Sequence, residues 1–318
     1  MSARLLALLV ATSAALALGC DAASGDRATS SSGAGAGAGA GGSATASSTS
    51  SLMEHPGHTQ PDAVFLPKPS GACPTLVTGK ATFAPEGIAA RDAQIHVSAD
   101  ADTKDGPLVF YWHGAGGSPT EATYVIDKPV MDAILAMGGM VAAPYHDPES
   151  TTLPWFLDLD DARDDDLRVA DEILGCMIEQ KGVDTRRIHS IGFSAGALHT
   201  VQFAARRSGY LASVVVYSGG QLFEPPIQDP ANYFAAMLFH GGPEDAVIVN
   251  FEVEQEKYHQ WMTDHERFSF LCNHGMKHNV PNDGPPAAWQ FLQDHPFGVK
   301  PEPYRDALPA GFPSYCAL

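Results

Sequence analysis

Basic side chains are scarce in this sequence of 318 residues. Lysine and arginine together number 19, against 37 aspartate and glutamate residues, so the formal net charge at pH 7 is −18. Non-specific binding to nucleic acid takes its energy from clustered lysine and arginine side chains that neutralise phosphates. The sequence therefore predicts no nucleic-acid partner.

Long apolar runs are lacking as well. The apolar run at residues 5–18 is shorter than the roughly 20 residues that a membrane-spanning helix needs, and Arg4 precedes it. A basic start and a short apolar core are typical of a signal peptide. The run ends in Ala17-Leu18-Gly19-Cys20, which resembles the lipobox of bacterial lipoproteins, where the cysteine is acylated. We expect residues 1–19 to be a signal peptide of the lipoprotein type, with ordinary cleavage and soluble secretion as the alternative.

Large side chains are rare in residues 20–63, where Ser, Gly, Ala and Thr dominate. Such a segment buries too little apolar surface to offset its ordering entropy. We expect a flexible tether here, and a folded domain over residues 64–318. The membrane would then be contacted only through a lipid anchor at Cys20. His55 and His58, near the end of the tether, are predicted to be solvated rather than to bind a metal.

Cysteine is infrequent, with five residues in the chain. Apart from Cys20 they are Cys73, Cys176, Cys272 and Cys316, and an even number in an exported protein predicts two disulfides of open connectivity. One option joins Cys73 to Cys316, because they lie near the two ends of the folded region. A separate alternative for Cys176, which lies in a predicted helix, is a buried thiol.

Short β-rich runs alternate with helical patterns through most of the folded region. This alternation predicts an α/β domain with a mostly parallel sheet and helices on both faces. The predicted strands are residues 75–83, 94–98, 108–112, 140–143, 187–193, 212–217, 236–239 and 268–271, and the predicted helices are residues 124–137, 164–180, 195–206, 251–263 and 287–294.

The segment Gly192-Phe193-Ser194-Ala195-Gly196 matches the nucleophile-elbow pattern G-x-S-x-G. A predicted strand precedes it and a predicted helix follows, as the elbow requires. Small neighbours allow a sharp turn that holds the serine hydroxyl above the sheet, next to the backbone N–H groups of a helix N-terminus. We therefore predict Ser194 as a nucleophile.

A serine of ordinary pKa is a weak nucleophile, so a base and an orienting carboxylate are expected after it in the order acid, then histidine. Asp245 follows a predicted strand closely and is the preferred acid. Glu244 is the near alternative, and Asp229 and Asp264 are less well placed.

The base is predicted to follow the last strand of the sheet. His278 is the preferred residue and His274 the alternative, because both lie between that strand and the closing helix. His199 and His240 are less suitable, since one lies in the helix after the serine and the other in a turn.

An oxyanion hole needs two N–H donors near the nucleophile. The backbone of Ala195, directly after the serine, is predicted to supply one donor. Ala115, in the glycine-rich loop His113-Gly114-Ala115-Gly116-Gly117, is predicted to supply the other.

These motifs resemble the α/β-hydrolase superfamily, and within it the polyhydroxybutyrate depolymerases and the feruloyl or acetyl-xylan esterases. The resemblance covers residues 73–298 and includes Ser218-Gly219-Gly220 and the segments 166–168, 183–188 and 240–245. It implies Ser194 as nucleophile, Asp245 as acid and His278 as base. Many of those proteins have a tryptophan soon after the catalytic histidine, where this chain has Asn279-Val280-Pro281.

Two loops are expected to border the site, residues 144–161 and 219–233, and neither is long enough for a large lid domain. We expect an open cleft edged by aromatic side chains, with Trp155 and His146 in contact with substrate. Such a cleft suits a polymer or a bulky aryl ester. Aspartates between residues 158 and 166 are predicted to stabilise the start of a helix, and no metal or other cofactor is expected.

The resulting hypothesis is an exported serine esterase, acting as a monomer in the bacterial cell envelope or after secretion. Its substrates would be feruloyl or acetyl esters of polysaccharides, or related aryl esters. One alternative is a polyhydroxyalkanoate depolymerase. An alternative of another class is a surface lipoprotein that binds a ligand without catalysis.

Overall fold

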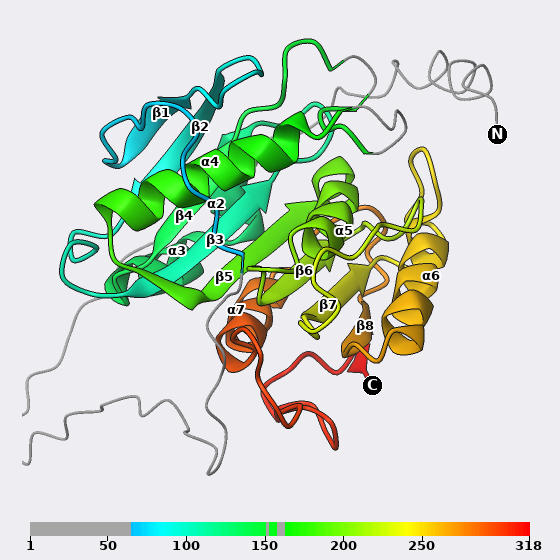
Figure 1. Ribbon diagram of the computed structural model, residues 1–318. Coiled ribbons are helices and arrows are strands. Elements are labelled where there is room, and N and C mark those ends of the chain that lie inside the picture. Colours follow the sequence, from blue (N-terminus) through cyan, green and yellow to red (C-terminus); the bar gives the residue numbers. More distant parts are fainter. Residues whose placement is uncertain (1–64, 151–152, 158–162) are drawn as a thin grey trace, which may run out of the picture. The chain divides into compact units, whose positions relative to one another are not determined.

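The computed structural model describes residues 65–150, 153–157 and 163–318 (Figure 1). The predicted signal peptide, the tether and Cys20 lie outside these residues. Asp158, Asp160 and Asp161 of the acidic segment also lie outside them. No helix in the described part of the chain is both long enough and apolar enough to cross a bilayer.

One nine-stranded sheet runs through the described domain, in the order β1-β2-β4-β3-β5-β6-β7-β8-β9. Strands β4, β3, β5, β6, β7 and β8 pair in parallel, whereas β1, β2 and β9 pair antiparallel at the two sides. The mostly parallel sheet is thus confirmed. The bounds are β1 Gly79–Phe83, β2 Arg91–Val97, β3 Gly106–Trp112, β4 Met140–Pro144, β5 Val183–Phe193, β6 Ser213–Tyr217, β7 Ala235–His240, β8 Ser269–Asn273 and β9 Cys316–Ala317.

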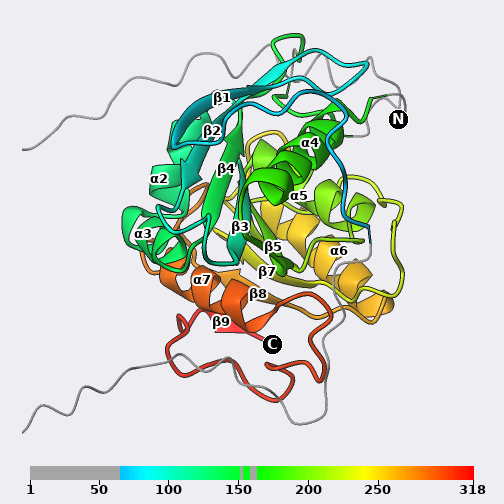
Figure 2. The same cartoon turned by 60° about the vertical axis from the view of Figure 1, so that its left-hand side comes forward.

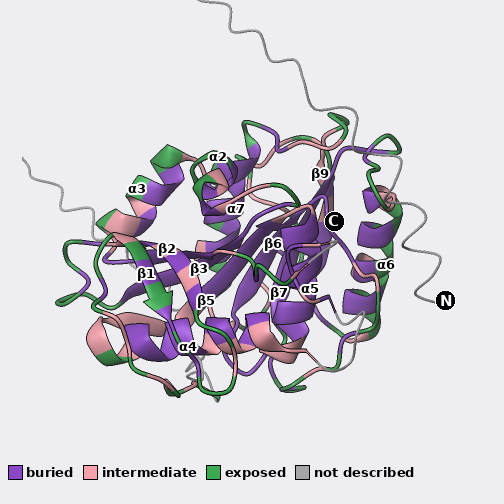
Figure 3. Cartoon of the chain, turned by 90° about the horizontal axis from the view of Figure 1, so that it is seen from above, coloured by how far each residue is buried: buried purple, intermediate pink, exposed green. Residues whose placement is uncertain are grey.

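Helices cover both faces of the sheet, as Figures 2 and 3 show. On one face lie α2 (Ala122–Val125), α3 (Lys128–Ala136) and α7 (Gly284–Asp294), whose buried side chains share a core with the sheet. On the other face lie α4 (Asp165–Gln180), α5 (Ala195–Arg206) and α6 (Phe251–Asp264). The predicted layers are therefore present.

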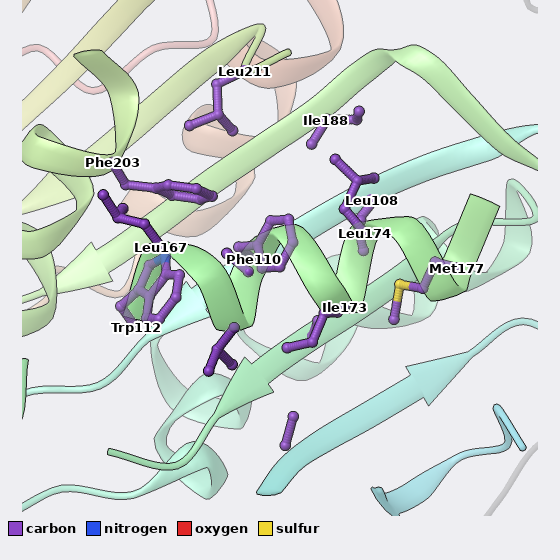
Figure 4. Packing of buried hydrophobic residues seen from close by; sticks show 14 of the residues in the cluster. Leu108, Phe110, Trp112, Leu167, Ile173, Leu174, Met177, Ile188, Phe203 and Leu211 are labelled. Atoms are coloured by element: carbon purple, nitrogen blue, oxygen red, sulfur yellow. The ribbon is translucent and has the colours of Figure 1, made fainter. Parts of the chain in front are cut away.

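The central strand β3 is buried along its whole length, because helices cover it on both sides. Its side chains alternate between the two cores: Phe110 and Trp112 face α4 and α5, and Tyr111 faces the opposite layer. Figure 4 shows Phe110 beside Phe203 of α5, with ring centroids 5.4 Å apart. This packing fixes the end of β3, from which the glycine-rich loop starts.

The prediction of a single helix over residues 124–137 is wrong, because the helical conformation is interrupted at Asp127. Asp127 has a φ of 65°, and its carboxylate accepts a hydrogen bond from the N–H of Val130. An N-cap aspartate and Pro129 in the first turn are start signals for a new helix. The continuous apolar pattern concealed these signals. The structure therefore has two helices, α2 and α3, in place of the one that was predicted.

The four cysteines of the domain form two disulfides, Cys73–Cys176 and Cys272–Cys316. The pairing of Cys73 with Cys316 and the free thiol at Cys176 are therefore wrong. Cys176 on α4 lies next to the segment that precedes β1, with 5.4 Å between the Cα atoms of the first pair. Cys272 and Cys316 are direct partners in the register of β8 and β9. Strand β9 itself had no pattern long enough to predict.

Candidate active site

Ser194 lies on a sharp turn between β5 and α5. Its φ is 56° and its ψ is −122°, a conformation that residues other than glycine seldom adopt. The turn is tight on both sides, since a Cβ on Gly196 would collide with the Trp112 carbonyl and one on Gly192 with the Gly196 carbonyl. The glycines of the motif therefore fulfil a steric requirement, and the strained backbone marks a functional position.

Ser194, His278 and Asp245 form a hydrogen-bonded line. The Oγ of Ser194 lies 3.0 Å from Nε2 of His278, and Nδ1 of the same ring lies 2.8 Å from Oδ1 of Asp245. A carboxylate only accepts, so Nδ1 carries the proton and Nε2 is free to accept from the serine hydroxyl. An imidazole held in this way can remove the hydroxyl proton.

The sheet topology brings these residues together. Strands β5, β6, β7 and β8 are consecutive neighbours in the sheet and run parallel. Ser194 follows the carboxyl end of β5, Asp245 follows that of β7 and His278 follows that of β8. Carboxyl ends of parallel strands meet at one edge, where open α/β sheets bind ligands. Residues 84 positions apart in the sequence, Ser194 and His278, are neighbours for this reason.

The carboxylate of Asp245 is fully buried and bound through both oxygens. Its Oδ2 accepts hydrogen bonds from the Ser218 hydroxyl at 2.8 Å and from the Gly241 N–H at 2.9 Å. Burial alone would raise the pKa of Asp245, but the hydrogen bonds from His278, Gly241 and Ser218 outweigh it and lower the pKa. The site therefore keeps this carboxylate charged.

The side chains of the alternative acids and of the alternative base make other contacts and do not join this hydrogen-bonded line. Glu244 is exposed and pairs with Lys277 at 2.6 Å, while Asp264 accepts from Gln260 at the surface. Asp229 accepts from the N–H of Ala231. His274 accepts from the N–H of Met276 through Nδ1.

The two less suitable candidates for the base, His199 and His240, do not contact the serine. His199 is buried beside Trp112, with ring centroids 4.3 Å apart, and burial lowers the pKa of His199 to about 3. Through Nδ1, His240 accepts from the Gly242 N–H at 3.3 Å, so it stabilises its own turn.

Ser218 was missed as a site residue, although its motif was noted for the resemblance. It directly follows β6, the strand between the serine strand and the acid strand, and its φ is 49°. A serine at the carboxyl end of an intervening strand was the available signal. Its hydroxyl now joins the hydrogen-bonded line from the far side of Asp245.

Phe251 was also missed, and it holds the His278 ring from one side. The rings of Phe193 and Phe251 both stack on the imidazole, each with a centroid separation of 4.9 Å. The N–H of Phe251 donates to the carbonyl of Asp245 at 2.8 Å. Two aromatic faces and one carboxylate thus fix the orientation of the imidazole, whose side chain is 24% exposed.

The two predicted oxyanion donors belong to segments that adjoin Ser194. Ala195 is the first residue of α5, where backbone N–H groups lack partners within the helix. The glycine-rich loop packs directly on the turn, since a Cβ on Gly114 would lie 3.3 Å from Cβ of Ser194. Ala115 follows Gly114 and is exposed.

Trp155 is not a substrate platform, and that prediction is wrong. Its side chain is 2% exposed and packs edge-on against Trp112, with ring centroids 5.0 Å apart. Its indole N–H donates to the carbonyl of His113 at 2.9 Å. Trp155 therefore supports the glycine-rich loop from the core. His146 is exposed, with Nδ1 3.4 Å from Nε2 of His113.

The described aspartates of the acidic segment do not cap the helix through their side chains. Asp164 is the N-cap of α4 but its side chain makes no capping hydrogen bond, and Asp165 pairs with Arg163 at 2.6 Å. Asp166 is buried and pairs with Arg91 at 2.6 Å. Within the described ranges, no group of three or more His, Cys, Asp or Glu residues could hold a metal ion.

A hollow of about 180 Å³ lies beside the loop that carries His278. Tyr124 of α2 borders it, and its hydroxyl donates to Oδ1 of Asn279 at 2.7 Å, directly after the histidine. The lining combines polar and apolar residues: Thr123, Tyr124, Asp127, Asn282, Val280, Pro281 and Pro285.

Comparison with known proteins agrees with this architecture. The model of the dienelactone hydrolase family matches residues 158–290, which is less than half of the chain. The solved structure of native pOPH has a TM-score of 0.61 and 17% identity, over 77% of this chain and 96% of pOPH. A complex of a pOPH variant with pNPB gives a TM-score of 0.61 at 16% identity, over 79% and 96%.

A thermostable esterase gives a TM-score of 0.52 at 18% identity, over 68% of this chain and 62% of that one. No curated protein matches the chain significantly in sequence. The chain has the α/β-hydrolase fold, which confirms the predicted fold class. The family found here differs from the depolymerase and feruloyl esterase groups named above, so the resemblance to those groups stays a prediction.

Proposed function

We propose that this chain is a serine hydrolase of carboxylic esters that works through a covalent acyl-enzyme. The observation that carries the proposal is the line from Ser194 through His278 to Asp245, on a strained turn of an α/β-hydrolase fold. The match to the dienelactone hydrolase family and the esterase among the structures of this fold support it.

In the acylation step, Nε2 of His278 takes the hydroxyl proton as Oγ of Ser194 attacks the ester carbonyl. The carbonyl oxygen becomes an alkoxide, and the N–H groups of Ala115 and Ala195 stabilise its charge. Asp245 stabilises the imidazolium through Nδ1. The intermediate collapses, the C–O bond to the alcohol breaks, and His278 gives its proton to the departing alcohol oxygen.

Deacylation repeats these steps with water as the nucleophile. His278 removes a proton from water, whose oxygen attacks the acyl-enzyme carbonyl. The bond to Ser194 breaks and its oxygen regains a proton from the imidazolium. One ester and one water thus give one acid and one alcohol, and no cofactor is needed.

For the substrate we propose acyl esters of polysaccharides, of the feruloyl or acetyl type. The alcohol must lie near His278, which protonates it, and Val280, Pro281 and Asn282, which line the hollow, follow that histidine in the same loop. Tyr124 offers a half-exposed ring, while Asp127 and Asn282 offer polar groups that suit a hydroxylated ring. A polyhydroxyalkanoate remains the second candidate, and its aliphatic alcohol would not use these polar groups.

Phosphonate labelling tests the reaction class directly. We expect a fluorophosphonate to form one adduct, on Ser194, and p-nitrophenyl acetate hydrolysis to fall by at least about 1,000-fold in Ser194→Ala. Ser190→Ala, which changes a buried serine of β5, serves as the matched control with activity retained. Equal rates for wild type and Ser194→Ala would contradict an enzyme and favour the non-catalytic binding module.

A further inference from the structure

Glu121 lies beneath the glycine-rich loop and has no role in the mechanism above. It ends the short helix η2 (Pro119–Glu121), after the loop. One carboxylate oxygen, Oε2, accepts a hydrogen bond from the Tyr111 hydroxyl at 2.7 Å and another from the Gly114 N–H at 2.8 Å. A side chain that bonds both the sheet and this loop connects the core to the predicted oxyanion hole.

The peptide unit after Gly114 carries the N–H of Ala115. Its carbonyl, on Gly114, accepts the N–H of Gly117 at 3.0 Å and lies 2.8 Å from Nδ1 of His113. In a planar trans peptide the N–H points opposite to the C=O. Fixing the Gly114 carbonyl therefore fixes the direction of the Ala115 N–H.

Glu121 adds a second restraint on Gly114, at its N–H rather than at its carbonyl. Gly114 is held at its N–H by Glu121 and at its carbonyl by Gly117 and His113, so neither adjoining peptide can rotate freely. Hydrogen bonds to a carboxylate are stronger than those between neutral groups.

Tyr111 anchors the carboxylate in turn. It is a fully buried residue of β3, and burial, reinforced by Glu121, raises the pKa of Tyr111 well above its ordinary value, so the hydroxyl stays a donor. The rigid sheet thereby determines where the carboxylate sits.

We propose that Glu121 is a positioning residue that orients the Ala115 N–H toward the developing oxyanion. The inference rests on the proposed ester hydrolysis and adds a residue that acts through the loop rather than on the substrate. Removing Glu121 would leave Ser194, His278 and Asp245 in place and loosen one oxyanion donor.

A comparison of an ester with its thionoester isolates this role. Sulfur accepts hydrogen bonds weakly, so an oriented donor speeds the ester far more than the thionoester. In Glu121→Ala we expect kcat for the ester to fall by about 10- to 100-fold, KM to change by less than about threefold, and the ester-to-thionoester rate ratio to fall about 10-fold. Glu121→Gln, whose carbonyl oxygen can accept both bonds, should restore most of the ratio.

Two further variants keep the test decisive. Tyr111→Phe leaves the Gly114 bond and removes the anchor, so it should lower the ratio, but less than Glu121→Ala does. It carries the test alone if Glu121→Ala does not fold. Asp132→Ala, on the surface of α3, should leave both rates unchanged. A ratio equal to wild type in every Glu121 and Tyr111 variant would overturn the role of Glu121 alone. A wild type no faster than Ser194→Ala would overturn the proposed function and this inference together.

Discussion

Asp245 is held through both carboxylate oxygens, and Ser218 supplies one of the hydrogen bonds. A buried charge is stable only when its hydrogen-bonding capacity is met. Ser218 therefore contributes to the charge state of Asp245 as well as to its position. The backbone of Ser218 is also strained, with a φ of 49°, which is consistent with a site requirement at this position.

Replacing Ser218 with alanine should cost stability in a pH-dependent way. We expect Ser218→Ala to lower the free energy of unfolding by about 1–3 kcal/mol at pH 7. The folded-state pKa of Asp245 is lowered, so this stabilisation is complete above the unfolded-state pKa of about 3.9 and is lost as the pH falls through the folded-state value.

Urea unfolding of wild type and Ser218→Ala from pH 7 down to about pH 2 measures this difference. The difference in free energy of unfolding between wild type and Ser218→Ala should decrease at low pH. Ser190→Ala removes a buried hydroxyl that bonds the Trp112 indole rather than a carboxylate, so its difference from wild type should not depend on acid pH. A difference between wild type and Ser218→Ala that stayed constant to the lowest pH would contradict Asp245 as the partner of Ser218.

At this scale, the sequence was sufficient for the three residues of the hydrogen-bonded line and insufficient for those around them. Ser194, Asp245 and His278 each follow a strand, and that pattern can be read locally. Phe251 and Glu121 meet the site only through tertiary packing, because nothing in their own sequence neighbourhood indicates an imidazole or a loop nearby. Trp155 was misplaced because an aromatic in a loop can pack inward as well as outward.

The long helices α4, α5 and α6 match their predicted ranges to within one residue, whereas β5 begins at Val183, four residues before its predicted start. One departure came from short-range chemistry within a longer pattern: Asp127 divides the helix predicted for residues 124–137. The division creates α2, a short helix whose Tyr124 faces the loop after His278. A continuous helix would not have revealed this contact, so the pairing of these two elements was not predictable from periodicity.

The contact between α2 and that loop leads to a prediction about substrate choice. Tyr124→Ala removes the ring beside the hollow, so kcat/KM for an acetylated methyl glycoside should fall by about 10-fold, as for loss of one stacking surface. Hydrolysis of ethyl acetate, whose alcohol is too small to reach the ring, should change by less than about twofold.

Tyr124→Phe is the matched control for Tyr124→Ala, because it keeps the ring and loses only the hydroxyl bond to Asn279. We expect an intermediate loss on the glycoside ester. Equal losses on both esters in Tyr124→Ala would argue against an alcohol subsite and against a sugar as the alcohol.

For the molecule as a whole, we propose export and anchoring through Cys20. The two disulfides support an oxidising compartment, since such bonds are uncommon in cytosolic proteins. The full-length chain, expressed in a bacterial host, should incorporate labelled palmitate and sediment with membranes. Cys20→Ser should lose both properties. Label in the Cys20→Ser protein would place the acyl group on another residue, and a soluble wild type without label would favour ordinary secretion.

Strand β9 has a consequence for the exposed edge of the sheet. An outermost strand with unpaired N–H and C=O groups is a template on which another chain can add. The short strand Cys316–Ala317 occupies that position on β8, and a covalent bond from Cys316 to Cys272 prevents it from peeling away. Strand β9 thus covers part of the edge of β8, and reduction of the disulfide would leave this cover held by non-covalent contacts alone.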